Sequence, residues 1–379
     1  MDFHTPVLHG MVAVIAWTIF SFDLPLVTGS IRMLPPVTGS VRTLPPVTGG
    51  VRTPPLVTGN VCTLPLVTGS VRTLPPVTGS VRKGLAIRLT DESGEERWGE
   101  IAPLPGRSKE TLDQAYDQLL QIFSKGKIQE EPLPSVQFGL EGALSDRSDI
   151  TAPLYALLHG TAEEILQRAE EVFASGYKTV KVKISSFSVD EATLLIHALK
   201  DRFRLRIDCN RAFSMTQALR LFSPFDPKQF DYIEDPTFEI EKLADFPFPF
   251  ALDEIVTDYH LLPLKSYQHL YGFILKPTLL GGKKGCAPFV KYAQEHNLNV
   301  VFSSTFESGL GLLHILHIAA HFNLLAHPVG IDTHRYLAHD ILHHDIDFKT
   351  PIIKITPSLK VNTERLKEVA HGKCALPHL

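Results

Sequence analysis

Apolar and polar positions follow a regular order along the second half of the chain. From about residue 150 to residue 322, short apolar runs are separated by segments whose apolar residues recur three and four positions apart. The short runs predict strands, and the amphipathic segments predict helices. The predicted strands are 177–184 and 204–208, followed by runs that end at residues 234, 252, 275 and 302. Regular alternation of strand and helix is typical of a parallel sheet.

Several helix starts in this half carry the same local signal. A Ser or Thr followed three residues later by Glu or Gln forms a capping box, which satisfies backbone N–H groups at the start of a helix. The pairs are Thr161 with Glu164, Ser188 with Glu191, and Ser214 with Gln217. The last helical pattern covers residues 309–322.

The first half of the chain has a different order. Residues 14–23 are rich in β-branched and aromatic residues and predict a strand. Residues 84–89 and 96–101 predict two more strands, on either side of the turn-rich segment 91–95, and residues 111–123 predict an amphipathic helix. Strands followed by helices describe a small α+β domain. In the second half, no G-x-G-x-x-G follows a predicted strand, which disfavours a dinucleotide-binding sheet. Because polar residues gather at the strand ends, we favour a closed barrel, whose active site lies at that face.

A tandem repeat interrupts the predicted α+β domain. Residues 24–83 are six copies of one decamer, of which LPPVTGSVRT is typical. Ten residues with one or two prolines and a Thr-Gly turn hold too little apolar surface to form a core. We therefore predict a disordered loop, in which one copy is native and the other five are an insertion.

Composition and charge narrow the classes of partner. The chain has 379 residues and a formal net charge of −4, with both signs interspersed, so the sequence offers no basic footprint for nucleic acid. The apolar stretch 11–20 is too short to span a bilayer, and the four cysteines show no C-x-x-C spacing. We expect a cytoplasmic protein, a monomer or small homo-oligomer, whose partner is a small-molecule carboxylate.

Two lysines stand out in the predicted strand 177–184. Side chains alternate along a strand, so Lys181 and Lys183 point to the same side. Two neighbouring ammonium groups disfavour each other's charge, which predicts a lowered pKa and a usable base near neutral pH. The alternative is an exposed edge strand whose lysines are solvated.

Three carboxylates each end a successive predicted strand: Asp208, Glu234 and Asp253. In a barrel these strand ends converge, and three oxygen ligands suit Mg²⁺, with Mn²⁺ as the alternative. Arg206 and Asn210 share the face of Asp208 by alternation, which makes them candidates for substrate binding. Taken singly, each of the three carboxylates has a simpler explanation as a helix cap.

Two further groups complete the candidate site. Lys276 ends the next predicted strand, across the barrel from Lys183. The strand after it leads into a Gly-flanked turn at 303–311, whose backbone N–H groups at a helix start suit an anion such as a substrate carboxylate. The turn's candidates for substrate binding are Ser303, Ser304 and Glu307.

As an ordered set, these motifs resemble the enolase superfamily in its muconate-lactonizing subgroup, and most closely the o-succinylbenzoate synthase family. The resemblance covers about residues 84–345 and the N-terminal strand. In the barrel, it is carried by VKVK at 180–183, RIDCNRA at 206–212, IEDP at 233–236, LDE at 252–254, LKPTLLGG at 275–282 and SSTFESGLGL at 303–312. In the N-terminal domain, GEIAPLPG at 99–106 and PSVQFGLEGAL at 134–144 are similar to the family's capping domain and its junction to the barrel.

The resemblance implies an α/β fold, a (β/α)7β TIM-like barrel with an N-terminal α+β capping domain. It places the capping domain at 1–145, the barrel at 146–335, and a C-terminal segment at 336–379 that packs back on the capping domain. The decamer array falls where the family has a flexible loop between the first two capping strands. That loop helps to close the active site.

The resemblance also implies a chemistry. Asp208, Glu234 and Asp253 would hold Mg²⁺, Lys183 would remove the proton α to the substrate carboxylate, and Lys181 and Lys276 would act as cations. Loss of water would then make the protein a hydro-lyase of menaquinone biosynthesis. The alternatives are an N-acylamino acid racemase or dipeptide epimerase of the same superfamily, or a member disabled by the repeat insertion.

Overall fold

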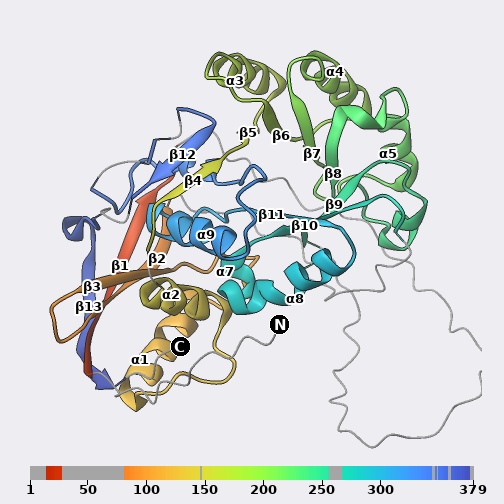
Figure 1. The fold of residues 1–379 in the computed structure, drawn as a ribbon. Coiled ribbons are helices and arrows are strands. Elements are labelled where there is room, and N and C mark those ends of the chain that lie inside the picture. The colour runs from red at the N-terminus through yellow and green to blue at the C-terminus, as the bar shows by residue number, and fades with distance from the viewer. Residues whose placement is uncertain are drawn as a thin grey trace, which may run out of the picture.

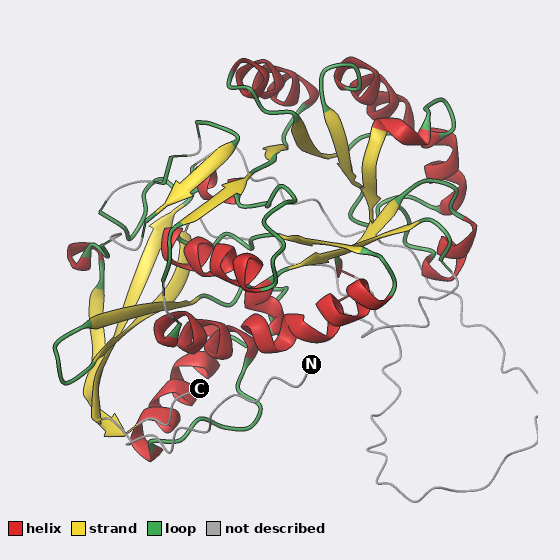
Figure 2. Cartoon of the chain, in the orientation of Figure 1, coloured by secondary structure: helices red, strands yellow, loops and turns green. Residues whose placement is uncertain are grey.

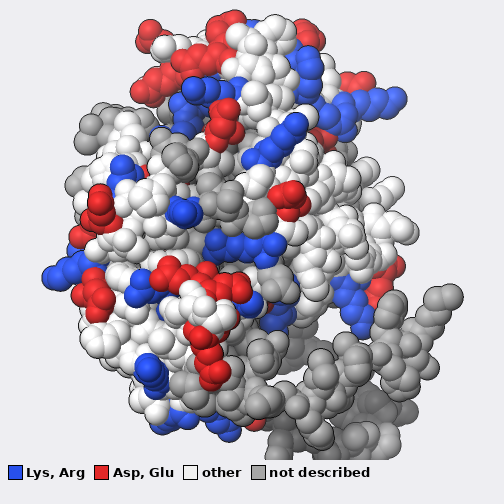
Figure 3. Space-filling model, turned by 60° about the vertical axis from the view of Figure 1, so that its left-hand side comes forward, with Lys and Arg blue, Asp and Glu red and all other residues white. Residues whose placement is uncertain are grey.

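The computed structural model describes residues 14–27, 81–145, 147–254, 256, 267–343, 346–347, 349–356 and 360–375. The predicted disordered loop therefore lies, apart from its two ends, outside the described residues. None of the helices in the described ranges is long and apolar enough to cross a membrane. Lys, Arg, Asp and Glu side chains are interspersed over the face shown in Figure 3.

An antiparallel sheet of four strands forms the capping domain (Figure 1). Its order is β13-β1-β2-β3, and its strands are β1 (Val14–Pro25), β2 (Val81–Thr90), β3 (Glu96–Ile101) and β13 (Lys367–Ala375). Helices α1 (Leu112–Lys125) and α2 (Pro134–Leu144) bury the sheet's apolar side chains. The three strands and the helix predicted from the sequence are confirmed, while β13 comes from the far end of the chain.

Seven parallel strands form the second sheet, in the order β11-β10-β9-β8-β7-β6-β5. They are β5 (Ala156–Leu158), β6 (Thr179–Lys183), β7 (Arg204–Asp208), β8 (Phe230–Glu234), β9 (Phe250–Leu252), β10 (Leu270–Leu275) and β11 (Asn299–Phe302). The helices are α3 (Ala162–Ala174), α4 (Val189–Leu199), α5 (Met215–Phe222), α7 (Pro277–Leu280), α8 (Gly282–Glu295) and α9 (Gly309–His321). Figure 2 shows α3, α4 and α5 along the outer side of their strands. All three capping boxes predicted from the sequence are present.

Residues 329–330 join the two edges of this parallel sheet. Val329 forms a parallel bridge with Leu154, just before β5, and Gly330 forms one with Ser303, just after β11. A short antiparallel pair, β4 (Ile150–Pro153) with β12 (Ile352–Ile355), lies beside this closure. The predicted fold class, an α/β barrel with an antiparallel capping sheet, is confirmed, whereas the domain boundaries stay a prediction.

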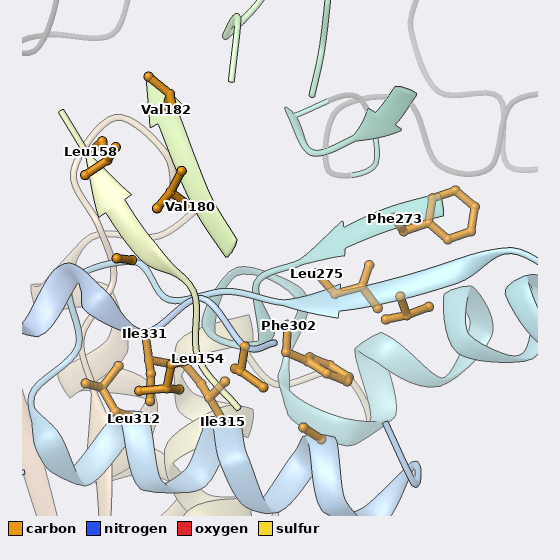
Figure 4. Packing of buried hydrophobic residues seen from close by; sticks show 14 of the residues in the cluster. Leu154, Leu158, Val180, Val182, Phe273, Leu275, Phe302, Leu312, Ile315 and Ile331 are labelled. Atoms are coloured by element: carbon orange, nitrogen blue, oxygen red, sulfur yellow. The ribbon is translucent and has the colours of Figure 1, made fainter. Parts of the chain in front are cut away.

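The core lies between the strands and the outer helices. Leu312 and Ile315 of α9 face Leu154, Phe302 and Ile331, and all five side chains are buried (Figure 4).

Alternation along β6 separates two kinds of side chain. Val180 and Val182 belong to the hydrophobic core. Lys181 and Lys183 must therefore point to the opposite side, toward the interior of the barrel.

The hairpin of β1 and β2 brings the two ends of the decamer array together. Leu24 pairs with Arg82 and Pro25 pairs with Val81. Deleting residues 31–80 shortens the connection between Pro25 and Val81 from 55 residues (26–80) to 5 (26–30) and leaves this register intact. We expect a soluble, folded variant whose free energy of unfolding in urea is higher by about 2 kcal/mol, because closing a shorter loop costs less entropy.

A one-copy deletion serves as the control for this prediction. Removing residues 41–50 alone should change the free energy of unfolding by only about 0.2 kcal/mol, since the cost depends on the logarithm of the loop length. An insoluble or less stable fifty-residue deletion would show that the array contributes contacts of its own.

Candidate active site

Strand register aligns the predicted lysines and carboxylates. Lys183 of β6 pairs with Asp208 of β7, and Asp208 pairs in turn with Glu234 of β8. Lys181 lies one alternation earlier, beside Arg206. Three adjacent parallel strands thus carry the charged groups of the site on one face.

Lys181 is buried between two carboxylates. Its Nζ lies 2.7 Å from Glu234 Oε1 and 3.0 Å from Asp208 Oδ2. Burial acts to lower the pKa of Lys181, but the charges of Asp208 and Glu234 outweigh it and raise that pKa well above its ordinary value. The expectation that repulsion between lysines would lower this pKa is therefore wrong for Lys181, which remains a cation.

Lys183 has a more open environment. Its Nζ lies 3.0 Å from Asp208 Oδ2 and donates a hydrogen bond of 3.1 Å to Asn210 Oδ1. The Lys183 side chain is 30% exposed, against 6% for Lys181. Of the two lysines, Lys183 is thus the one with surface available to a ligand.

Lys276 and Asp253 form the next ion pair of the site. Asp253 follows β9, and its position is fixed by Asp235, whose carboxylate accepts backbone N–H bonds of 3.1 Å from Asp253 and 3.0 Å from Glu254. Strand-end reasoning missed Asp235 and its contacts with the backbone of Asp253 and Glu254. Its signal in the sequence is its place directly after Glu234, and in the structure its backbone is left-handed, with a φ of 42°.

The carboxylates fit a divalent cation by their chemistry. Asp208 and Glu234 are fully buried, and Glu234 Oε2 makes no hydrogen bond among the described residues. Burial and, after it, the charge of Asp208 raise the pKa of Glu234 well above its ordinary value, so a cation bound beside this carboxylate would favour its ionised form. In the described ranges, no group of three or more His, Cys, Asp or Glu side chains is arranged to hold a metal ion. Between Asp208 and Glu234 lies the ammonium group of Lys181, which forms an ion pair with each of them.

Arg206 lies beside Lys181, on the adjoining strand, and is enclosed by other side chains. Its side chain is only 1% exposed, bonds to Asp231 and to the carbonyl of Pro328 at 3.0 Å each, and stacks against Tyr155 and Tyr232. A direct contact between Arg206 and substrate, as expected from the sequence, does not fit this arrangement. Arg206 instead places a fixed positive charge in the floor of the barrel.

The predicted anion site at the start of α9 is filled by the protein itself. Glu100 of β3 accepts the N–H groups of Ser308 and Gly311, at 3.1 and 2.9 Å. Asp340 accepts the N–H of Gly309 at 3.0 Å. The expectation that these N–H groups bind a substrate carboxylate is therefore wrong, because two internal carboxylates satisfy them.

The three substrate-binding candidates of this turn form hydrogen bonds with other parts of the protein. Ser304 donates its N–H and hydroxyl to the carbonyl of Gly330, at 2.9 and 3.0 Å, and the Ser303 hydroxyl lies 3.4 Å from the same oxygen. Glu307 is buried and accepts hydrogen bonds of 2.5 Å from the hydroxyl groups of Thr278 and Thr305. Their part in substrate binding stays a prediction that these contacts do not favour.

Glu100 should make stability depend on pH. Burial raises the pKa of Glu100 from an ordinary 4.5 to about 8, despite hydrogen bonds from Ser308 that lower it. Between these values the folded protein keeps a proton that the unfolded chain has lost, so this group's contribution to stability falls as pH rises from 4.5 to about 8. Glu100→Gln should flatten the dependence of the unfolding free energy on pH by up to about 1.4 kcal/mol per pH unit.

Urea unfolding at a series of pH values between 5 and 8 would test this. Glu96→Gln, at an exposed position of the same strand, is the matched control and should leave the pH dependence unchanged. Parallel curves for Glu100→Gln and the unmodified protein would contradict the prediction.

The fold and the site together define the class of protein. Residues 164–358 match the model for "Enolase C-terminal domain-like" proteins, and residues 68–147 match that for "MenC, N-terminal domain". The first match alone covers 195 of 379 residues, more than half of the chain. The chain therefore belongs to the enolase superfamily, and the predicted resemblance is confirmed.

Particular relatives refine this membership. The chain is 32% identical over 273 residues to the o-succinylbenzoate synthase of Edwardsiella ictaluri, a match that covers 66% of this chain and 82% of that protein. Its fold is similar to that of the o-succinylbenzoate synthase of Thermosynechococcus elongatus, solved with Mg in the active site, at 23% identity and a TM-score of 0.61 over 85% of this chain and 94% of that one. It is also similar to that of the N-succinyl Arg/Lys racemase of Bacillus cereus, at 15% identity and a TM-score of 0.69 over 95% and 99%.

Proposed function

We propose that the protein is an o-succinylbenzoate synthase, a Mg²⁺-dependent hydro-lyase acting on 2-succinyl-6-hydroxy-2,4-cyclohexadiene-1-carboxylate. The observation that carries the proposal is the pair of lysines around Asp208, one open and one buried. Sequence similarity to o-succinylbenzoate synthases supports the choice of substrate.

Asp208, Glu234 and Asp253 are the residues that would hold the metal ion. All three are carboxylates at successive strand ends, whose oxygen atoms can serve as metal ligands. Each lies within ion-pair distance of a lysine ammonium group. When bound, Mg²⁺ polarises the substrate carboxylate and lowers the cost of negative charge at the neighbouring carbon.

The difference in exposure between the two lysines of β6 supports different roles for them. Lys183, with the larger exposed surface, takes the proton from the carbon α to the carboxylate and becomes an ammonium group. Lys181 is held charged by two carboxylates and supplies positive potential where the enediolate forms. Lys276, paired with Asp253, contributes a second cation.

Loss of water completes the reaction. The C–O bond of the ring hydroxyl breaks as the electron pair of the carbanion forms the new ring double bond. The ammonium of Lys183, oriented by Asn210, returns its proton to the departing hydroxyl. The products are water and the aromatic dicarboxylate, so atoms and charges balance.

An assay with purified protein tests the proposal. The protein is incubated with the cyclohexadiene substrate and Mg²⁺, and formation of the aromatic product is followed by ultraviolet absorbance. We expect turnover that depends on the metal. No turnover by either the full chain or the variant without residues 31–80 would overturn the proposal, whereas turnover by the shortened variant alone would show that the repeat array disables the enzyme.

A racemase or epimerase remains the second candidate, because Lys183 and Lys276 could each serve one face of a substrate. The fold similarity to the N-succinyl Arg/Lys racemase is compatible with it. Exchange of the α-proton of an N-succinylamino acid in D₂O, without dehydration of the cyclohexadiene, would favour this candidate.

A further inference from the structure

A chain of side chains runs from the capping domain to Lys183. Arg107 lies in the loop between β3 and α1 and forms an ion pair with Glu254 of the barrel. Glu254 Oε1 also accepts a hydrogen bond of 3.1 Å from Asn210 Nδ2, and Asn210 Oδ1 accepts one of 3.1 Å from Lys183 Nζ. The order of contacts is thus Arg107, Glu254, Asn210 and Lys183.

The direction of the Asn210 amide depends on Glu254. A side-chain amide donates through nitrogen and accepts through oxygen, so a carboxylate on one side determines which end faces the other. With its nitrogen directed to Glu254, Asn210 presents its oxygen to Lys183 and, at 3.4 Å, to the hydroxyl of Ser185. Its backbone is fixed as well, since its N–H donates to Asp208 Oδ1 at 3.1 Å.

Glu254 in turn depends on a cation. Its side chain is only 6% exposed, and a buried carboxylate that loses its charged partner is strongly destabilised. The loop that carries Arg107 is a compact turn, in which the N–H groups of Arg107 and Ser108 both donate to the carbonyl of Leu104, at 3.0 and 2.8 Å. Arg107 is therefore presented to Glu254 by a preorganised piece of the capping domain.

We infer that Arg107 is a positioning residue for the proposed base, acting through Glu254 and Asn210 on the ammonium group of Lys183. The inference rests on the proposed function, because it assumes that Lys183 transfers the proton. It means that the capping domain contributes to proton transfer. A base must stand close to its proton, and a displacement of about 1 Å can cost about 100-fold in rate.

Two substitutions of Arg107 test the inference. Arg107→Met removes the charge and keeps an unbranched, flexible side chain, and Arg107→Lys restores the charge. We expect Arg107→Met to lower kcat by about 10- to 100-fold with KM changed less than about threefold, and Arg107→Lys to recover most of the loss. Arg97→Met, the same change on β3 of the capping domain, is the control and should leave kcat unchanged.

A second measurement does not need turnover. The side-chain amide of Asn210 can be followed in ¹⁵N NMR spectra of the full-length protein without substrate. Arg107→Met should shift this signal and speed its hydrogen exchange, whereas Arg97→Met should not.

The two measurements distinguish failure of the proposed function from failure of the coupling between Arg107 and Lys183. If neither the unmodified protein nor the variant without residues 31–80 dehydrates the substrate but the Asn210 signal responds, the proposed function fails and the coupling stands. If kcat and the Asn210 signal are both unchanged in Arg107→Met, or if KM rises while kcat is constant, the coupling is overturned.

Discussion

Replacing Lys183 with alanine should lower kcat by about 10²- to 10⁴-fold, the range that a positioned general base contributes. Lys183 is the lysine of β6 with surface available to substrate, and Lys181 on the same strand cannot take over its task, because Lys181 is buried and held as a cation. Steady-state kinetics of dehydration at saturating Mg²⁺ would measure the loss.

Binding of Mg²⁺ should survive the same substitution, since Lys183 is not among the proposed metal ligands. Calorimetric titration of Lys183→Ala with Mg²⁺ would check this. Lys291→Ala, at a position whose side chain is 78% exposed, should retain full activity. Undiminished turnover of Lys183→Ala would move the role of base to another residue, with Lys276 the first to examine.

The second large effect is expected at a metal ligand. Glu234→Gln keeps the size of the side chain but removes the charge of a proposed metal ligand. A metal ion that stabilises a developing enediolate lowers the activation free energy by several kcal/mol. Activity should fall by about 10³-fold or more, and the affinity for Mg²⁺ should fall with it. Calorimetry and kinetics on the same preparation would show whether the two losses coincide.

The fold should tolerate this change, because Lys181 keeps Asp208 as a partner at 3.0 Å. Thermal unfolding of Glu234→Gln would confirm that any loss of activity is not loss of structure. Glu241→Gln, at an exposed position shortly after β8, is the control and should affect neither the metal nor the rate. Normal Mg²⁺ affinity in Glu234→Gln would remove Glu234 from the proposed metal ligands.

Much of the barrel could be predicted from local patterns. Strands β7 and β8 end at Asp208 and Glu234, as their short runs of strand-forming residues predicted. The alternation of side chains along β6 correctly predicted that Lys181 and Lys183 point to the same side of the strand. These features depend on residues close in sequence, where period and capping signals are strong.

Features that depend on distant residues could not be predicted this way. The sequence showed free N–H groups at the start of α9 but not that Glu100, 208 positions before Ser308, would satisfy them. The sequence predicted Asp208 and Glu234 in the same site as Lys181, but not that they would lie 3.0 and 2.7 Å from Lys181 Nζ, and these short distances reverse the expected direction of its pKa shift.

Strand β13 was not predicted from the sequence, because its residues are mostly polar and its side chains are exposed or only partly buried. It is defined by pairing with β1, from Val14 opposite Ala375 to Ser21 opposite Lys367. Such pairing is a property of the partner strand, so the sequence of the C-terminal segment carries little signal of it.

The position of β13 also sets an order of events during synthesis. A ribosome releases β1, β2 and β3 early, yet the strand that flanks β1 is made only after every strand of the barrel. Until then, β1 is an uncovered sheet edge, which can pair with the wrong partner. The nascent chain should therefore complete its barrel first and its cap last, and stalled chains lacking residues 367–375 should be prone to aggregate.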